Sequence, residues 1–533
     1  MEKQVYDIVS MRFWDWLAII MLLLVLITVA VIVKSKQKGK EDFFLAGRSM
    51  NIMLVLCSMF AGLFSTITFV SVPGEAYQHG LMFFTINIGM IFFIPLAIWL
   101  FLRFFFLTET FTAYEYLERR YNLPVRLTGA FFYVLVRLFY AGIVFYSGSK
   151  VFESLLGWHP LVTILGIGFF TIIYTATGGM KAIIINDTIQ CFIIIIGIIA
   201  IFSKLISLSD TSVFQIYNYA RDNGHTFGGL LKAEFYQLRF YDRYNFWLFM
   251  YSVITIPLVS LSADQSIVQK LLSSKGYGGA KKAVFLNSII SIPIVGMLWF
   301  VGIALFYYYN NIKTIDTSVI TSDKILGYFI NTELPTPLPG LITAALLAAL
   351  MSTIDSTVNC IANVSYIDGF VRLGFNKKKY FKREMLVCRS ISILAGITSV
   401  IIAVFLHLGG KGIVSSIYEI SALWTGLWGV LFVAFFLGVL VPRVAGMPIL
   451  IGLIVGGITS LVLPFFLYYN IPVENRICFS WVTVPGCIVA LILALVLSYF
   501  WPNKKNLDNL TLWTLKKKVT KKSSVCEMSR TGQ

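Results

Sequence analysis

Apolar residues occur in long runs along most of the chain, and each run is too uniformly hydrophobic to be one face of a soluble helix. About 20 such residues cross the hydrocarbon core of a bilayer as an α-helix. The pattern predicts about thirteen membrane-spanning helices. Their centres lie near Leu23, Met59, Phe92, Val144, Phe169, Ile195, Ile256, Ile294, Leu350, Gly396, Leu427, Gly456 and Leu491.

The second predicted span is interrupted by polar and small residues. Residues 61–68 (AGLFSTIT) and Ser71 bring hydroxyls and small side chains into the apolar run, which then meets Pro73, Gly74 and Glu75. This composition permits local unwinding, which frees backbone carbonyls where the segment lines a cavity. The same small residues also permit close packing of intact helices. The sequence leaves both interpretations open.

The ninth predicted span carries a polar stripe. Ser352, Asp355, Ser356, Asn359 and Asn363 follow helical spacing and share one face, whereas the opposite face is apolar. An ionisable residue at membrane depth is costly, and it usually lines an ion or substrate path or pairs with another group. The stripe is therefore the first candidate for a functional site.

Composition supports an all-α polytopic membrane protein, since the 533 residues are 58% hydrophobic and only 13% charged. No connection reaches the roughly 100 residues of a folded extramembrane domain. We predict a leading helix at residues 13–34, a ten-helix core at 47–438, two trailing helices at 446–501 and a basic, flexible cytoplasmic tail at 502–533. Two inverted five-helix units are one common way to build a transporter core.

The net charge of +17 might suggest a nucleic-acid partner, but the basic residues cluster in alternate loops. The clusters are Lys34, Lys36, Lys38, Lys40 and Arg48 after the first span, Arg103, Arg119, Arg120 and Arg126 after the third, Lys270, Lys275, Lys281 and Lys282 after the seventh, and Arg372, Lys377, Lys378, Lys379, Lys382 and Arg383 after the ninth. Such alternation is the positive-inside pattern of membrane proteins. It predicts a protein of the plasma or inner membrane, with its amino terminus outside, its carboxyl terminus in the cytoplasm and no nucleic-acid partner.

Hydroxyl and carbonyl oxygens suit a hard cation such as sodium. Ser352 and Thr353 supply hydroxyls one helix turn from Asp355, and the interrupted second span supplies carbonyls. Together they form a candidate sodium site. The alternative is that both hydroxyls bond to carbonyls of their own helix, which is common in membranes.

Asp187 is a second carboxylate inside an apolar segment, residues 186–205. If it faces Asp355, the like charges repel, so a cation lies between them or one carboxyl stays protonated. Both outcomes imply ion or proton coupling. The alternative is that Asp187 caps a helix at the cytoplasmic interface.

Arg137 lies near the start of the fourth predicted span. Its guanidinium fork suits a substrate carboxylate, and its long side chain equally suits extension to the cytoplasmic interface, which we slightly favour. Enzyme signatures are missing from the sequence, which has no phosphate loop, HExxH or GxSxG elbow. We therefore expect a protein that is not an enzyme and has no transition-metal site.

Four groups of residues resemble the sodium:solute symporter family, in the family's order between about residues 42 and 370. They are residues 42–50 (DFFLAGRSM), residues 177–190 with TGGMKA and NDTIQ, Asp264-Gln265 with Gln269-Lys270, and Ala348-Ala349 with Ser352-Thr353. Within the family, the chain resembles the sialic acid transporters. Residues 72–77 (VPGEAY) and 140–144 (YAGIV) also resemble the iodide, multivitamin and monocarboxylate branch.

The resemblance implies a LeuT-like core of two inverted five-helix repeats that works by alternating access. The positions that match the family's main sodium site are Ala61, Phe64, Ala349, Ser352 and Thr353. Those that match a second ion site of sialic acid transporters are Asp187, Asp355 and Ser356, where Asp355 replaces a hydroxyl. Substrate positions match Ser65, Thr68, Phe83 and Asn87, while Arg137 lies about one turn from the carboxylate-binding arginine.

We therefore expect a symporter in the lipid bilayer that imports a small organic solute, such as a sugar, sialic acid or another organic anion, with Na⁺ as coupling ion. Two alternatives remain. A proton-coupled carrier would titrate Asp187 and Asp355, and a channel or sensor on the same scaffold would not concentrate its solute. The sequence does not indicate an oligomeric state.

Overall fold

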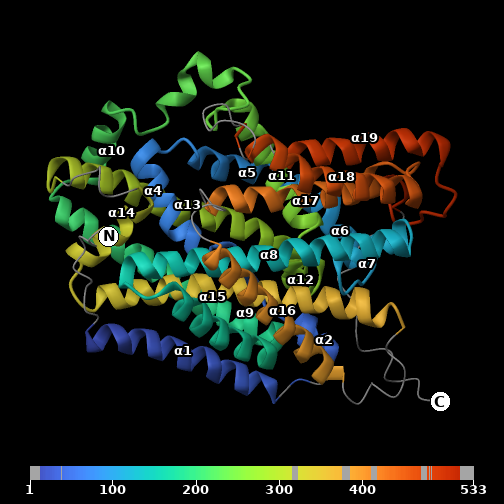
Figure 1. Ribbon diagram of the computed structural model, residues 1–533, viewed down its shortest axis with the longest axis horizontal. Coiled ribbons are helices and arrows are strands. Elements are labelled where there is room, and N and C mark those ends of the chain that lie inside the picture. Colours follow the sequence, from blue (N-terminus) through green and yellow to red (C-terminus); the bar gives the residue numbers. More distant parts are fainter. Residues whose placement is uncertain are drawn as a thin grey trace.

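The computed structural model describes residues 12–515, except residues 36, 38, 315–321, 375–383, 410–416, 470–476, 479–480 and 482. Helices account for nearly all of the described structure (Figure 1). Within those residues the only β pairings are isolated bridges, Met50 with Ser274 and Val444 with Pro502. The predicted all-α fold is confirmed.

Fourteen long or paired helices build the bundle. They are α1 (Phe13–Lys34), α3 (Ile52–Leu63), α4 (Thr66–His79), α5 (Phe84–Ala97), α8 (Leu123–Leu156), α9 (Pro160–Ser209), α11 (Phe246–Ser262), α12 (Gln265–Leu272), α13 (Tyr277–Asn311), α15 (Leu338–Val364), α16 (Glu384–Leu408), α17 (Ile417–Leu440), α18 (Gly446–Tyr469) and α19 (Val484–Phe500). Short helices at the ends are α2 (Lys40–Leu45), α6 (Arg103–Leu107), α7 (Ala113–Arg120), α10 (Val213–Asp222) and α14 (Ser322–Glu333). Single turns and π-helical segments are η1 (Ala46–Arg48), η2 (Ile98–Leu102), η3 (Gly228–Leu231), η4 (Ala233–Tyr236), η5 (Ser365–Val371) and η9 (Leu512–Thr514).

Among the described residues, eight helices are long and apolar enough to cross a membrane, or ten if the bent pairs α3/α4 and α11/α12 each form one span. The segments Gly426–Leu440 and Val484–Phe500 are shorter apolar helices. The fifth and sixth predicted spans are joined in α9, whose 50 residues would measure about 75 Å. Gly179 leaves the helical conformation there (φ 58°, ψ −168°) and divides α9 into two limbs. The count of thirteen spans stays a prediction.

The helix α15 lies at the centre of the bundle. Its apolar window is 94% buried, compared with 28% for α1. Figure 1 shows α1 along one edge of the molecule and the α18/α19 pair towards the opposite edge. Neighbouring helices therefore surround α15, and the polar groups of its stripe need hydrogen-bond partners from those helices.

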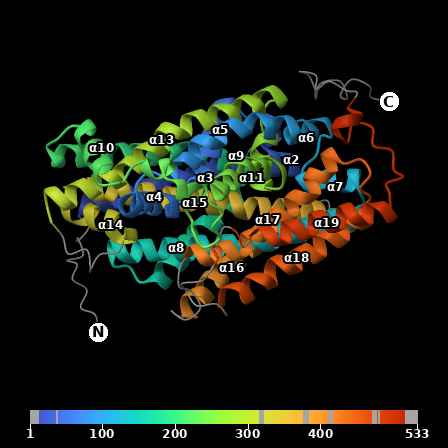
Figure 2. The same cartoon turned by 90° about the horizontal axis from the view of Figure 1, so that it is seen from above.

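The bundle has two distinct ends. In both views α10 and α14 lie at one end, and α6 and α7 lie at the other (Figures 1 and 2). Basic segments from distant parts of the chain meet near α7, where Arg48 donates to Thr110 O (2.9 Å) and Lys505 donates to Glu118 O (3.2 Å). Alternate basic loops thus share one end, as the positive-inside pattern requires.

Part of the predicted tail packs against this end. Tyr116 Oη donates to Leu510 O (2.8 Å), and Trp513 Nε1 donates to Leu440 O (2.7 Å). Apolar side chains cause the docking, since Leu507 is buried and Leu510 packs on the core beside α7. The expectation of a flexible tail from residue 502 is wrong for residues 502–515, and residues 516–533 lie outside the described part.

Candidate cation site

The second span is broken between α3 and α4, which meet at 63°. Phe64 has an extended backbone (φ −95°, ψ 91°), and Ser65 caps α4, with its Oγ accepting from Thr68 N at 3.3 Å. A serine at this position satisfies one of the free amides at a helix start. Of the two interpretations of this sequence, unwinding is the one observed.

The polar stripe of α15 lies directly opposite the break. Ser352 Oγ lies 2.9 Å from Ala61 O and 3.1 Å from Ala349 O, and Thr353 Oγ1 donates to Ala349 O at 3.0 Å. The alternative in which both hydroxyls bond to their own helix is therefore also realised, but Ser352 reaches across as well. Four neutral oxygens from two helices converge in a buried place.

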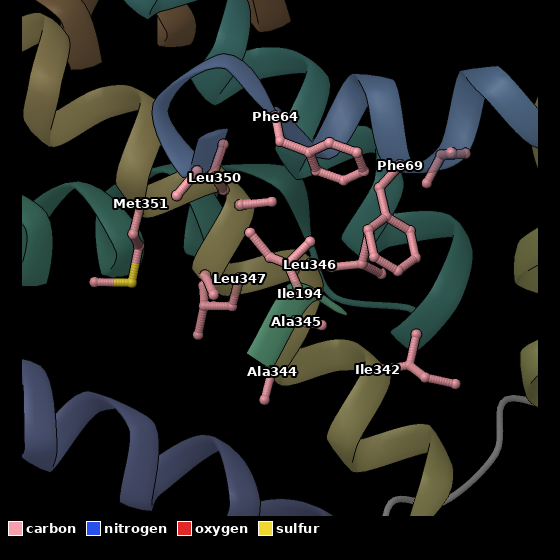
Figure 3. Close-up of a cluster of buried hydrophobic side chains, with 14 of the residues drawn as sticks. Phe64, Phe69, Ile194, Ile342, Ala344, Ala345, Leu346, Leu347, Leu350 and Met351 are labelled. Carbon is pink, nitrogen blue, oxygen red and sulfur yellow. The ribbon is translucent and has the colours of Figure 1, made fainter. Parts of the chain in front are cut away.

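Apolar packing holds the two helices together around these oxygens. Phe64 stacks on Phe60 at 5.4 Å and meets Phe69 edge-on at 6.0 Å. Figure 3 shows Phe64 and Phe69 beside Leu346 of α15. Thr66 Oγ1 also donates to Leu346 O at 2.9 Å, which ties α4 to α15. A rigid apolar wall excludes water and strengthens any ion–oxygen contact inside it.

These oxygens fit a monovalent hard cation. Sodium takes hydroxyl and carbonyl oxygens as ligands, and Ser352 and Thr353 can turn their hydrogens away and offer lone pairs instead. Within the described residues, the hydrogen bonds of Ser352 and Thr353 go to backbone carbonyls and not to carboxylates. The oxygens that would contact the ion are therefore all uncharged.

Asp187 of α9 is a second candidate ion ligand, and it interacts electrostatically with Asp355 of the α15 stripe. It is fully buried inside α9, so its interpretation as an interfacial helix cap is wrong. Its Oδ2 accepts from Ser58 Oγ (2.5 Å) and from Lys270 Nζ (3.0 Å), and Lys270 also donates to Ser58 O (2.7 Å). Asp187 therefore has a cationic partner from within the chain.

Lys270 is placed wrongly by its sequence context, which groups it with the basic loop after the seventh span. It belongs to α12 and is only 2% exposed. Its neighbours Val268, Leu271 and Leu272 are apolar and buried. A single lysine among such apolar residues was the sequence signal that could have indicated its burial. Ser58 carried no comparable signal, because serine is common in membrane helices.

Asp355 has its own hydrogen-bond donors. Tyr174 Oη donates to its Oδ2 at 2.8 Å, and Ser356 Oγ lies 3.3 Å from its Oδ1. It also interacts electrostatically with Asp187 and Lys270. The predicted pair of facing carboxylates is thus a larger group that includes one ammonium and one phenol.

Arg137 is buried, with 7% exposed, so its expected extension to the cytoplasmic interface is wrong. It forms an ion pair with Asp264 and donates to Ser266 Oγ at 2.7 Å. Its guanidinium also lies over the ring of Trp428 at 5.0 Å. Asp264 sits at the second helix break, where α11 and α12 meet at 56°. The guanidinium of Arg137, which could have bound a substrate carboxylate, is thus already paired with the carboxylate of Asp264.

The predicted substrate residues fall into two groups. Ser65 and Thr68 lie together at the first break, with their hydroxyls 3.2 Å apart. Phe83 instead packs against Tyr244 (5.0 Å between ring centroids), which donates to Glu75 on α4. Ten residues of helix separate Ser65 from Glu75, or about 15 Å.

A guanidinium accompanies the second of these groups. Arg243 pairs with Glu75 and lies over the Phe83 ring at 5.2 Å. Asn87 is one turn beyond Phe83 and half-buried. The two groups define an inner and an outer position along α4.

A charged network ties the helices together near α7. Arg126 donates to Asp368 (2.6 Å) and Glu118 (2.7 Å), and Thr112 donates to Asp368 (2.9 Å). Hydrogen bonds from Arg372 hold the pKa of Glu118 below its ordinary value. The network joins α7, α8 and η5 at the basic end of the bundle.

The bundle contains two broken membrane helices, α3/α4 and α11/α12, and the first break offers oxygens that suit a cation. Broken helices with an ion site near the centre are typical of transporters built from inverted repeats. The sequence model of the sodium:solute symporter family matches residues 43–456. The chain belongs to this family, which makes it a sodium-coupled membrane transporter and not an enzyme. The family resemblance expected from the sequence is confirmed.

Two sialic acid symporters match along most of their length. The sodium/sialic acid symporter NanT of Aliivibrio fischeri is 25% identical over 84% of this chain and 88% of its own. The symporter SiaT of Proteus mirabilis is 26% identical over 84% and 90%. The human sodium/iodide cotransporter is 28% identical, but the match covers 52% of this chain and 42% of that protein. The chain thus spans less than half the length of this relative.

Solved structures show the same fold. A Na⁺-coupled sialic acid symporter in a substrate-bound, outward-open state superposes with a TM-score of 0.83 over 93% of this chain and 100% of that chain, at 24% identity. The transporter Mhp1 in a closed conformation gives 0.52 over 86% and 94%, at 14% identity. The LeuT-like architecture is therefore confirmed.

Proposed function

We propose that this protein imports a small organic anion of the sialic acid type, driven by sodium bound between the first helix break and α15. The observation that carries the proposal is the contact of Ser352 Oγ with Ala61 O (2.9 Å) across the break. The relatives that match along most of both chains are sialic acid symporters, which supports this solute class.

The proposed sodium ligands are Ala61 O, Phe64 O, Ala349 O, Ser352 Oγ and Thr353 Oγ1. Sodium in this place would fix α3 and α4 against α15, and thereby set the position of Ser65 and Thr68 beside it. Sodium and solute then bind cooperatively, because each orders the geometry that the other needs. A tenfold sodium gradient and 100 mV supply about 3.7 kcal/mol per ion, enough for roughly five-hundredfold accumulation of a neutral solute. A monovalent anion cancels the charge of the ion, so the sodium gradient alone, about 1.4 kcal/mol, then limits its accumulation to about tenfold.

The proposed substrate path runs along α4. Ser65 and Thr68 form its inner part, and Phe83 and Asn87, with Arg243 beside Phe83, form its outer part. Arg137 remains part of the proposal as a positioning residue, since its pairing with Asp264 sets the second break beside the path. An anionic solute would meet Arg243 first, because opposite charge attracts ligands to a binding cleft.

The proposed orientation places the end with α7 in the cytoplasm and the end with α10 and α14 outside. The basic segments that meet near α7 support this assignment. The amino terminus is then outside and the carboxyl terminus cytoplasmic. The division into a leading helix at 13–34, a core at 47–438, trailing helices at 446–501 and a tail at 502–533 also remains a proposal.

The test is thermal unfolding of the purified protein in sodium or potassium buffer, alone and with N-acetylneuraminic acid, glucose, lactate, biotin or iodide. We expect sodium to raise the unfolding temperature, and N-acetylneuraminic acid to raise it further only when sodium is present. Uptake of the same solute into proteoliposomes should then require an inward sodium gradient. Stabilisation by solute that is equal in potassium and sodium would refute sodium coupling.

A further inference from the structure

The ε-ammonium of Lys270 is built into the centre of the bundle. The side chain starts on α12 and bridges α3 and α9, with Nζ 2.7 Å from Ser58 O and 3.0 Å from Asp187 Oδ2. It is 2% exposed, and Asp187 is fully buried. A charged lysine and a charged aspartate are tolerated at such depth only as a pair.

Gly62 shows where the ammonium lies with respect to the α15 stripe. A Cβ on Gly62 would stand 2.3 Å from Lys270 Nζ and 3.5 Å from Ser356 Oγ. The ammonium thus lies over the one place on α3 that lacks a side chain, with Ser356 close by. Asp187 and Ser356 are two of the three positions that the sequence predicts for a second sodium.

The groups around the ammonium are those that would bind a metal cation. Ser58 O and Asp187 Oδ2 are oxygen ligands, and both are occupied by Lys270. The third predicted ligand, Asp355, is turned to Tyr174 and Ser356 instead. An ammonium is a compact point charge, similar in charge to a sodium ion and held in place by its own chain.

We propose that the Lys270 ammonium takes the place of a second sodium ion, so that transport is coupled to one sodium and not two. The inference rests on the proposed sodium site at Ser352, since it concerns the ion count of that mechanism. A tethered cation neutralises Asp187 in every step of the cycle and carries no charge across the membrane. Coupling to a single ion limits accumulation to roughly five-hundredfold for a neutral solute, and to about tenfold for a monovalent anion, whose charge cancels that of the ion.

Removal of the lysine should create a second sodium site. In Lys270→Ala, Ser58 O and Asp187 Oδ2 lose the ammonium, and Asp187 Oδ1 already has no partner among the described residues. Equilibrium binding of ²²Na⁺ to the purified full-length protein measures the count without any solute. We expect one sodium per chain in the wild type, two in Lys270→Ala, and one again in Lys270→Ala combined with Asp187→Asn.

Control variants distinguish a failure to fold from the loss of a sodium site. Lys281→Ala removes an exposed lysine of α13 and should bind one sodium with unchanged affinity. If Lys270→Ala alone does not fold, Lys270→Met with Asp187→Asn removes both charges together, which membrane and soluble cores tolerate far better than one bare charge. That double variant should also bind one sodium, and loss of its sodium binding would overturn the proposal.

Two further results would overturn the inference: two sodium ions in the wild type, or one in a folded Lys270→Ala. Stabilisation of Lys270→Ala by acid, with no response to sodium, would likewise show that Asp187 takes a proton in place of a metal. Ser352→Ala distinguishes failure of the ion-count inference from failure of the proposed function. If it removes the single wild-type sodium while Lys270→Ala gains none, only the ion-count inference fails; if the wild type binds no sodium, the proposed function fails.

Discussion

The two helix breaks occupy corresponding places in the two halves of the bundle, yet they differ in charge. At the first break, Ala61 O meets two neutral donors, the Ser352 hydroxyl (2.9 Å) and the Phe64 amide (3.2 Å). At the second, Asp264 caps α12 by accepting from Ser266 N (2.9 Å) and pairs with Arg137. One break leaves neutral oxygens that can hold an ion, and the other carries its own counter-ion.

The difference shows that a broken membrane helix is not in itself an ion site. Unwinding frees oxygens in both places, but a cation gains most where no resident positive charge competes for them. The short helix after the second break also supplies Lys270, which neutralises Asp187 near the first break. Resident charges therefore decide which freed oxygens remain for sodium.

The largest effect should come from Asp264→Ala, which leaves the Arg137 guanidinium buried without its partner. Removing one member of a buried pair typically costs about 3–5 kcal/mol, so we expect little folded protein. Size-exclusion profiles and thermal unfolding in detergent measure this. Arg137→Met with Asp264→Leu should recover most of the stability, and an Asp264→Ala variant as stable as the wild type would show that the second break does not depend on charge.

A smaller loss should follow from Gly62→Ala, whose Cβ would lie 2.3 Å from Lys270 Nζ. Overpacking of a tight site costs about 1–3 kcal/mol, and the ammonium must shift to relieve it. Gly166→Ala is the matched control, since a Cβ there meets nothing within 4 Å, and it should be neutral or slightly stabilising. Equal unfolding temperatures for both variants would argue that the ammonium does not lie against α3.

Ser352→Ala tests the neutral break directly. Loss of one hydroxyl ligand should weaken sodium binding about tenfold, equivalent to about 1.4 kcal/mol, while the fold loses only one ordinary hydrogen bond. Ser392→Ala is the control, because within the described residues that buried serine bonds to Cys388 O of its own helix, at 3.1 Å. Sodium titrations of the unfolding temperature compare them. The same sodium affinity in both variants would show that Ser352 is not a sodium ligand.

The smallest effect concerns the solvent-accessible charges near α7. Arg372 lowers the pKa of Glu118, so the folded state gains stability above the ordinary glutamate pKa of about 4.3 and loses it as the pH falls. Exposed pairs contribute under about 1 kcal/mol. Arg372→Gln should therefore unfold slightly earlier at pH 7, and its difference from the wild type should shrink as the pH falls below the ordinary glutamate pKa, in potassium buffer. A cost as large as that of Asp264→Ala would mean that burial is not what separates these ion pairs.

The sequence by itself determined the membrane class and the helical fold, and it reduced the second span to two interpretations, of which unwinding was one. Long apolar runs leave a membrane helix as their main outcome, and the small and hydroxylated residues of 61–68 mark the place where the helix unwinds. Helical spacing also identified the α15 stripe, because a period of 3.6 residues fixes which side chains share a face.

Only the tertiary structure decided which faces meet. Lys270 and Asp187 are 83 residues apart, and Arg137 and Asp264 are 127 apart. Periodicity within each helix cannot assign such partners, since it says nothing about how helices are rotated and packed against one another. The charge of each break, and with it the place left for sodium, therefore depends on contacts between distant segments.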